Sequence, residues 1–293
     1  MINMTNRVPM TMLAQLDEVA IFQTAAFAHN DVDEPAAQNQ RTGYEGQSNY
    51  GELNLGLHVH DNATKVLDNR MRLLTALNEQ LADDLTDQRH AINSLHWVSQ
   101  VHGKQIHDVD ATALNMAPMA ADAIVSQQNG RGLAIMTADC VPIVLYQPTS
   151  GKIAAIHAGW QGLACGVIKE TVNRFTDSSP IQAWIGVCIS QENYEVNTDV
   201  RDKLLAGCIT NQTLSDKHID DFVSLFSISS NDDKIKLDLP KLAGMQLEAA
   251  GVTVMKDLPV VCSYADAHYY SYRRQTHMQQ PATGRMALVI VRR

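Results

Sequence analysis

Apolar side chains recur with a helical period over one long stretch of the chain. They are Val66, Leu67, Met71, Leu74, Leu77 and Leu81. Residues at this spacing lie on one face of an α-helix, where they can be buried together. Asn62 stands just before the stretch, and an asparagine at that position accepts a hydrogen bond from the first helical turn. The pattern therefore predicts a helix over about residues 63–83.

The middle of the chain and its C-terminal end contain short apolar runs separated by turn residues. Runs of this kind, rich in Val, Ile and Leu, are typical of β-strands. Thr149-Ser150-Gly151 lies between two of the runs and predicts a hairpin. The predicted strands are residues 53–60, 95–101, 123–125, 133–137, 142–146, 152–157, 183–189, 252–255 and 286–291.

Further helices are predicted beside the later strands. They cover residues 162–175, 198–206 and 240–250. The last of them has Pro240 in its first turn, where proline is favoured, and Gly251 directly after its end, where glycine is a typical stop signal. Strands and helices therefore share the second half of the chain.

Three segments show no regular period. Residues 1–15 are expected to form a loose N-terminal leader, and residues 210–236 are polar with no clear pattern. Residues 30–52 are rich in Asn, Asp, Gln, Gly and Pro and predict a long loop, a feature that is often functional in a compact chain. Because nothing between the predicted elements resembles a linker, residues 16–293 are expected to form a single domain.

Composition narrows the class of protein. Among 293 residues, 45% are hydrophobic and the net charge is −9, so a large core is expected and a general nucleic-acid binder is not. No apolar stretch is long enough to span a membrane, and the N-terminus is a poor signal peptide. The five cysteines are an odd number and are widely scattered, which favours free thiols in a reducing cytoplasm over a disulfide framework.

Three residues with metal-binding side chains stand at the ends of apolar runs. They are His102 in Gln100-Val101-His102-Gly103, Cys140 in Thr137-Ala138-Asp139-Cys140, and His157 in His157-Ala158-Gly159-Trp160. Two imidazoles and a thiolate are a ligand set suited to zinc, with copper as the less favoured alternative. Their separations are long and include no short ligand pair, so spacing alone does not show that they meet.

Other uses of these residues stay open. Cys140 can instead be a nucleophile activated by His157 or His102, with Asp139 orienting a histidine or only capping a turn. His58 and His60 stand two apart and can also hold a metal if they share one face of a strand.

Two groups of residues near the C-terminal half can bind anions or bases. Gly159, Gly162 and Gly166 follow a predicted strand and enter a predicted helix, an arrangement that can direct main-chain amides at an anion or simply allow close helix packing. The runs Tyr270-Ser271-Tyr272-Arg273-Arg274 and Thr283-Gly284-Arg285 combine aromatic rings with fixed cations, which suit phosphate and stacked bases.

Taken together, the motifs resemble the YfiH-like laccase-domain family, formerly labelled polyphenol oxidase and also called the peptidoglycan editing factor family. The order and approximate spacing of the matching blocks agree from about residue 40 to the C-terminus. The blocks are Leu53-Asn54-Leu55-Gly56, Gln100-Val101-His102-Gly103, Thr137-Ala138-Asp139-Cys140-Val141-Pro142, His157-Ala158-Gly159-Trp160, Ser271-Tyr272-Arg273-Arg274 and Thr283-Gly284-Arg285-Met286-Ala287.

The resemblance implies a fold, a metal site and an activity. The fold is a single α+β domain with mixed β-sheets packed together and flanked by helices. The implied zinc ligands are His102, Cys140 and His157. The implied reactions are phosphorolysis of adenosine, inosine, guanosine and methylthioadenosine, and deamination of adenosine. Alternatives are a Cys140 hydrolase that acts in editing peptidoglycan precursors and a copper-dependent polyphenol oxidase.

Candidate substrate contacts and partners complete the prediction. Arg273 and Arg41 are candidate phosphate ligands, Asn54 is a candidate substrate contact, and Cys140 with Asp139 is the candidate catalytic pair. Nucleoside and phosphate are the expected partners of a cytoplasmic monomer or homodimer, without nucleic acid or membrane. The sequence departs from the family pattern at Gln161, where the family usually has an arginine that can hold phosphate.

Overall fold

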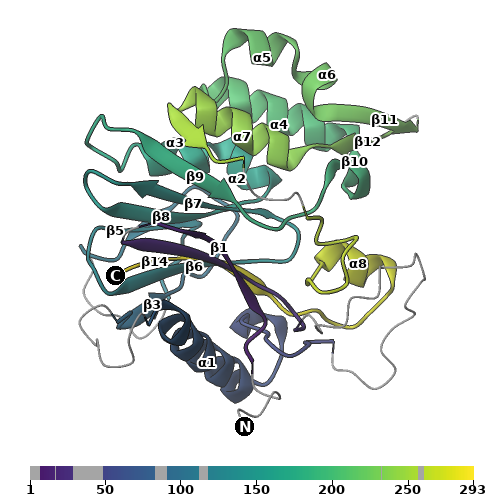
Figure 1. The fold of residues 1–293 in the computed structure, drawn as a ribbon. Helices are drawn as coiled ribbons and strands as arrows, with labels where there is room; N and C mark the ends of the chain where they lie inside the picture. The colour runs from purple at the N-terminus through teal and green to yellow at the C-terminus, as the bar shows by residue number, and fades with distance from the viewer. Residues whose placement is uncertain are drawn as a thin grey trace.

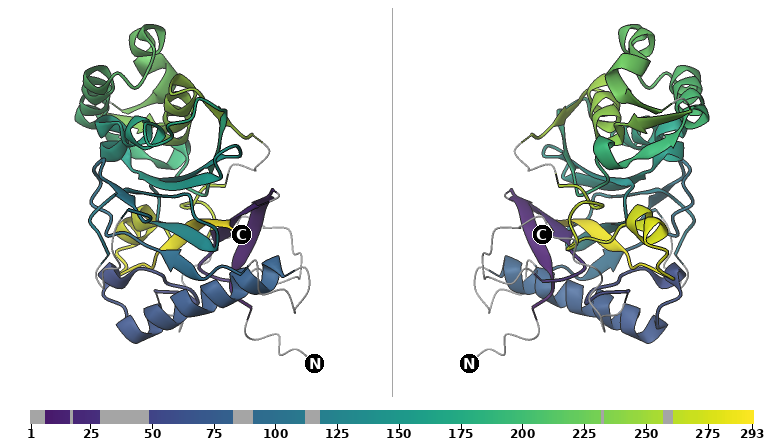
Figure 2. Two further views of the ribbon diagram at one scale, coloured as in Figure 1. Left: turned by 90° about the vertical axis from the view of Figure 1, so that its left-hand side faces the viewer. Right: turned by 90° about the vertical axis from the view of Figure 1, so that its right-hand side faces the viewer.

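The computed structural model describes residues 7–16, 18–28, 49–82, 91–111, 118–231, 233–256 and 261–293. Their helices and strands are stacked in layers (Figure 1). A group of helices covers one face of a six-stranded sheet, a five-stranded sheet packs on its other face, and one long helix covers the far side. The two side views show the same stacking (Figure 2).

The six-stranded sheet contains most of the predicted central strands. Its order is β13 (Val252–Val254), β9 (Ile181–Ile185), β7 (Val141–Gln147), β8 (Lys152–Ala158), β5 (Ala123–Ser126) and β4 (Ile106–Asp108). β7 and β8 form the predicted antiparallel hairpin. The two outer pairs, β13 with β9 and β4 with β5, are parallel, so the sheet is mixed.

The five-stranded sheet joins the two ends of the chain. Its order is β1 (Met10–Gln15), β2 (Val19–Thr24), β14 (Met286–Arg292), β6 (Arg131–Thr137) and β3 (Ser94–His96). β14 lies in the middle and is antiparallel to both β2 and β6. The C-terminal strand is therefore central to this sheet, where every residue from Met286 to Val291 is buried.

Both faces of β7 are covered, which explains why the strand has no polar alternation. Ile143 and Leu145 belong to the core between this sheet and the helices. Val144 and Tyr146 belong to the core between the two sheets. A strand buried on both faces is apolar at consecutive positions, because neither set of side chains meets water.

One helix closes the outer face of the five-stranded sheet. α1 (Ala63–Leu81) packs Leu73 and Leu77 against Val289 of β14 in a third core. The predicted cap is confirmed, because the Asn62 side chain accepts a hydrogen bond from the main-chain N–H of Lys65 at 3.2 Å.

The remaining described elements lie on the helical side of the six-stranded sheet or close to its edge. A small third sheet has the order β10, β12, β11. The elements are α2 (Trp160–Cys165), α3 (Val167–Val172), β10 (Glu195–Asn197), α4 (Thr198–Asn211), α5 (Asp216–Asp220), α6 (Phe222–Phe226), β11 (Ser227–Asn231), β12 (Lys234–Leu237), α7 (Leu239–Ala249) and α8 (Tyr272–His277). The α+β class with mixed sheets flanked by helices is thereby confirmed, and among the described helices none is long and apolar enough to cross a membrane.

The structure corrects three predicted elements. The single helix expected over residues 162–175 is two short helices, because Gly166 adopts a left-handed conformation (φ +80°) that ends α2. Of the leader expected over residues 1–15, its second half is strand β1, and residues 1–6 lie outside the described part. The polar stretch 210–236, for which the sequence predicts no element, contains helices and two strands.

The predicted strand over residues 53–60 is also wrong. This segment is extended only at its start and then forms a short 3-10 helix, Leu57–Val59, with His60 left-handed at its end (φ 65°). The Asn54 side chain accepts the main-chain N–H groups of Gly56 and Arg285. Side-chain hydrogen bonds of this kind compete with strand pairing, which explains why the alternating pattern misled.

Candidate metal centre

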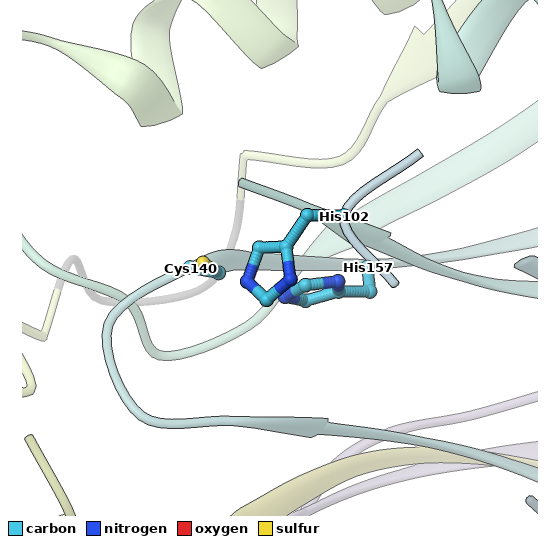
Figure 3. A group of neighbouring side chains, drawn as sticks. All are labelled: His102, Cys140 and His157. Atoms are coloured by element: carbon cyan, nitrogen blue, oxygen red, sulfur yellow. The ribbon is translucent and has the colours of Figure 1, made fainter. Parts of the chain in front are cut away.

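His102, Cys140 and His157 converge where β7 begins and β8 ends (Figure 3). Their ligand atoms all lie within 4.8 Å of one another. The two imidazole rings meet edge to face, with centroids 4.7 Å apart and planes at 83°. His157 is only 3% exposed, Cys140 is partly exposed and His102 is exposed. The cluster is therefore closed on one side and open to solvent on the other.

Each of the three residues comes from a different structural context. His157 lies on β8 and pairs with Pro142 of β7. Cys140 lies where the chain crosses from β6 in one sheet to β7 in the other, a crossing that places Asp139 at φ 108°. The Thr137 hydroxyl donates a 2.6 Å hydrogen bond to the Cys140 carbonyl and holds the crossing together.

Gly159 leaves the space that the cluster occupies. A Cβ atom at this position would lie 2.9 Å from Cys140 Sγ and 3.3 Å from the His102 ring. Because such contacts are shorter than side chains tolerate, the glycine after β8 lets the thiol and the ring approach each other. The glycine run identified in the sequence thus serves close packing at this position.

The thiol and the buried histidine perturb each other's proton affinity. Burial alone would raise the pKa of Cys140, but the charge of His157 and hydrogen bonds from both histidines lower that pKa to about 6. Burial alone would lower the pKa of His157, but the Cys140 thiolate and the Asp122 carboxylate raise it to about 9. A thiolate paired with an imidazolium is the expected state of the metal-free cluster between these values.

Asp122 is hydrogen-bonded to both histidine-bearing segments of the cluster, a role that no motif in the sequence predicts. Its carboxylate is fully buried and accepts the Nδ1–H of His157 at 2.9 Å. It also accepts main-chain N–H groups from Val101, His102 and Gly103. Burial would raise the pKa of Asp122, but the His157 ring and the amides of Gly103 and His102 lower it below the ordinary value.

The donor set fits a single transition-metal ion. Two imidazoles and a thiolate match the three protein ligands of a catalytic zinc site, which leaves one position for water or substrate. The exposed side at His102 suits that fourth position. Within the part of the chain that the structure describes, these residues form the one group of three or more such side chains, and His58 and His60 do not belong to it.

The other expected site residues have different surroundings. Asn54 is fully buried, and its Nδ2 group donates to Asp61 at 2.9 Å while its oxygen accepts two main-chain amides. Contact of the Asn54 amide with a substrate would require these hydrogen bonds to break. Arg273 donates from Nη1 to the Glu195 carbonyl at 2.6 Å and lies 5.1 Å from the Tyr194 ring. Arg41 lies outside the described residues.

Asp139 and Arg285 also lie near the cluster. The Asp139 carboxylate accepts the Ser263 hydroxyl at 2.7 Å and the Arg273 main-chain N–H at 2.6 Å. Burial lowers the pKa of Arg285, while the charges of Cys140 and Asp139 oppose that shift, so this guanidinium is within electrostatic range of the thiolate. Arg285 stands in the Thr283-Gly284-Arg285 run, whose cation suits phosphate.

The fold and the cluster define a class: α+β proteins with two packed sheets that bring two histidines and one cysteine together. The chain belongs to the family described as multi-copper polyphenol oxidoreductase laccase, whose family model matches residues 35–293. The resemblance to YfiH-like laccase-domain proteins is thereby confirmed.

Relatives and solved structures agree with this assignment. The chain is 34% identical over 257 residues to the purine nucleoside phosphorylase YfiH of Escherichia coli, covering 87% of this chain and 92% of that protein. It is 32% identical over 257 residues to a purine nucleoside phosphorylase of Pseudomonas aeruginosa, with the same coverage. The crystal structure of a Neisseria meningitidis protein matches with a TM-score of 0.72 at 26% identity, covering 97% of this chain and 98% of that one.

Proposed function

We propose that this protein is a zinc-dependent purine nucleoside enzyme that cleaves nucleosides with phosphate. Two observations support the proposal: a cluster of two histidines and a cysteine with one open side, and relatives named purine nucleoside phosphorylase. The substrates implied by the resemblance are adenosine, inosine, guanosine and methylthioadenosine. Deamination of adenosine at C6 is a further activity implied in the same way.

The asymmetry of the cluster is the observation that carries the proposal. His157 is buried and held by Asp122, whereas His102 faces solvent. A bound zinc ion would supply Lewis-acid polarisation of a group at its open position. The side chains on the closed side are already in place before the substrate binds. Charged groups fixed in this way stabilise the transition state, because the protein does not have to rearrange during the reaction.

In phosphorolysis, a phosphate oxygen forms a bond to ribose C1′ while the bond from C1′ to the purine nitrogen breaks. The electron pair of that bond passes to the purine, which takes up a proton. Phosphate and the departing purine both carry negative charge, so cations near the cluster stabilise the transition state. Arg285 suits this purpose, because its Nη1 is fixed by hydrogen bonds to the Thr283 and Gly284 carbonyls at 3.2 and 3.0 Å. Arg273 and Arg41 remain the candidate phosphate ligands predicted from the sequence.

Purified protein tests the proposal directly. Its metal content is measured by mass spectrometry, and inosine and adenosine are incubated with and without phosphate. We expect bound zinc, and formation of free base with ribose 1-phosphate only when phosphate is present. Cys140→Ala should lose both zinc and turnover, whereas Cys165→Ala, at the end of α2 and outside the cluster, should keep both. Oxygen consumption with a phenol that tracks copper content, without nucleoside cleavage, would contradict the proposal.

One feature of the site favours a cysteine hydrolase as the second candidate. Cys140, His157 and Asp122 place a thiolate, an imidazolium and a carboxylate next to one another. Nucleophilic catalysis by cysteine uses the same arrangement of groups. In that case the Cys140 sulfur bonds to an acyl carbon of a peptide-like substrate while the acyl–nitrogen bond breaks, and the amine leaves with a proton from His157. Water then hydrolyses the thioester and restores the thiol, so no metal is needed. Activity on a peptidoglycan precursor that survives complete removal of zinc by a chelator would favour this candidate over the nucleoside enzyme.

A further inference from the structure

Asp122 lies directly before β5, between the segment that carries His102 and the strand that carries His157. Its carboxylate has no exposed surface. Four N–H groups point at it: those of Val101 at 3.3 Å, His102 at 2.9 Å and Gly103 at 2.6 Å, and the ring Nδ1–H of His157 at 2.9 Å. All four donors belong to the two segments that carry the histidines.

The three main-chain donors form a concave nest around the carboxylate. Consecutive amides converge in this way only when the backbone turns sharply, and His102 is left-handed with φ 60°. Convergent N–H dipoles form a concavity that is stabilised by an anion lying between them. Asp122 supplies that anion from inside the protein. The main-chain path that directs the His102 side chain to the cluster therefore depends on the Asp122 charge.

The fourth donor sets the orientation of His157. With Nδ1–H directed at Asp122, the other ring nitrogen, Nε2, faces Cys140 and His102. The main chain is held at the same place, because the His157 N–H donates to the Asp122 carbonyl at 2.7 Å. A carboxylate on the far nitrogen of an imidazole fixes the ring and makes the near nitrogen a stronger ligand.

We propose that Asp122 is a positioning residue that prepares both histidines of the cluster for one metal ion, His102 through its main chain and His157 through its ring. The inference rests on the proposed function only in requiring that the cluster bind a metal. Cys140 is held separately by Thr137, so loss of Asp122 should disturb the two nitrogen ligands and leave the sulfur in place.

Asp122→Asn tests the proposal with little change in shape. An asparagine has one acceptor oxygen, and its amide group would face an N–H group of the nest or of His157. We expect the zinc affinity, measured by competition with a chromophoric chelator, to fall by about 10- to 100-fold, the usual effect of removing such a partner. In the cobalt-substituted variant, the visible bands of tetrahedral cobalt should shift, while the charge-transfer band from sulfur should remain.

A matched control lies at the other end of β5. The Asp110 carboxylate accepts the Ser126 hydroxyl at 2.7 Å and the Gln127 main-chain N–H at 2.6 Å, but contacts no residue of the cluster. Asp110→Asn should therefore leave zinc affinity and the cobalt spectrum unchanged. A folded Asp122→Asn protein with the zinc affinity and cobalt spectrum of the natural chain would overturn the proposal.

If Asp122→Asn does not fold, the natural protein still provides a test. After loading with cadmium-113, nitrogen NMR should show His157 bound to the metal through Nε2, with a slowly exchanging proton on Nδ1. Coordination through Nδ1 would overturn the proposal. Neither measurement uses nucleoside turnover, so a protein that binds metal in this way but cleaves no nucleoside would disprove the proposed function alone.

Discussion

Two buried aspartates lie close to the candidate metal centre, and they hold different parts of the protein. Asp122 accepts N–H groups from the two histidine-bearing segments. Asp139 accepts the Ser263 hydroxyl and the Arg273 main-chain N–H, both from the C-terminal part of the chain. Asp122 therefore organises the ligands, whereas Asp139 fastens the C-terminal segment to the crossing that bears Cys140.

This difference shows that the role of a buried carboxylate is decided by the groups that donate hydrogen bonds to it, and not by its place in the sequence. Asp139 stands next to Cys140 and is predicted, together with it, as a candidate catalytic residue. In the structure both of its oxygens accept hydrogen bonds from groups that hold the backbone. A catalytic role for Asp139 stays a prediction, and it would require at least one of these hydrogen bonds to be exchanged for a substrate contact.

The largest effect, on zinc binding, is expected for removing one of the two histidines that Asp122 holds. His102→Ala should abolish stoichiometric zinc binding and nucleoside turnover, because two ligands hold zinc far more weakly than three. Zinc per chain is measured after dialysis against a weak chelator. His58→Ala is the control, since His58 lies nearby but outside the group of three, and it should retain zinc. Full zinc in His102→Ala would disprove the ligand assignment.

A smaller effect, on stability instead of zinc binding, is expected for removing the charge of Asp139. Asp139→Asn should lower the free energy of unfolding by about 1–3 kcal/mol, the usual cost of leaving a buried donor without its acceptor. Urea unfolding of the zinc-free protein measures this change, and zinc binding should persist. Ser263→Ala removes only one of the donors and should cost less. Unchanged stability with full zinc but no turnover would instead support the catalytic role.

A second thiol, in the C-terminal segment that Asp139 fastens, sharpens the comparison between the two aspartates. Cys262 lies next to Ser263, and its sulfur accepts N–H groups from Ser190 and Asn193, both at 3.3 Å. Burial would raise the pKa of Cys262, but the hydrogen bonds to its sulfur lower it below the ordinary value. At a pH between the lowered and the ordinary value more thiolate is present, so alkylation by iodoacetamide should begin at a lower pH than for an ordinary cysteine.

Mass spectrometry of the alkylated peptides gives the pH profile of Cys262. Asn193→Ala removes one donor and should move the profile to higher pH. Cys188 is the internal comparison, because burial raises its pKa and it should react poorly across the same range. Equal profiles for the two cysteines would contradict the assigned role of the hydrogen bonds.

The smallest effect is expected at Gln161, an exposed residue in the first turn of α2. Gln161→Arg introduces the cation that the family usually has there and should lower the KM for phosphate severalfold with little change in kcat, since it adds binding shared by the ground and transition states. Gln161→Lys tests whether charge alone suffices. An unchanged KM for phosphate in both variants would remove this position from the phosphate site.

Elements with a local cause were predictable from the sequence. The helix capped by Asn62 and the β7–β8 hairpin both follow from short-range patterns that the structure confirms. The segment at residues 53–60 was not predictable, because the side chain of Asn54 takes up an amide of Arg285 that lies far away in the chain. The strand at Met10–Gln15 was missed because its half-buried pattern becomes meaningful only beside β2.

The sequence by itself determined the chemistry available to this protein: two histidines and a cysteine at the ends of apolar runs, in an order that matches one family. Tertiary structure alone decided that the three meet within 4.8 Å, and that Asp122 holds them. The physical reason is that a metal centre and a buried carboxylate depend on directions and distances between segments. Those are set when the two sheets pack, and no periodicity along the chain records them.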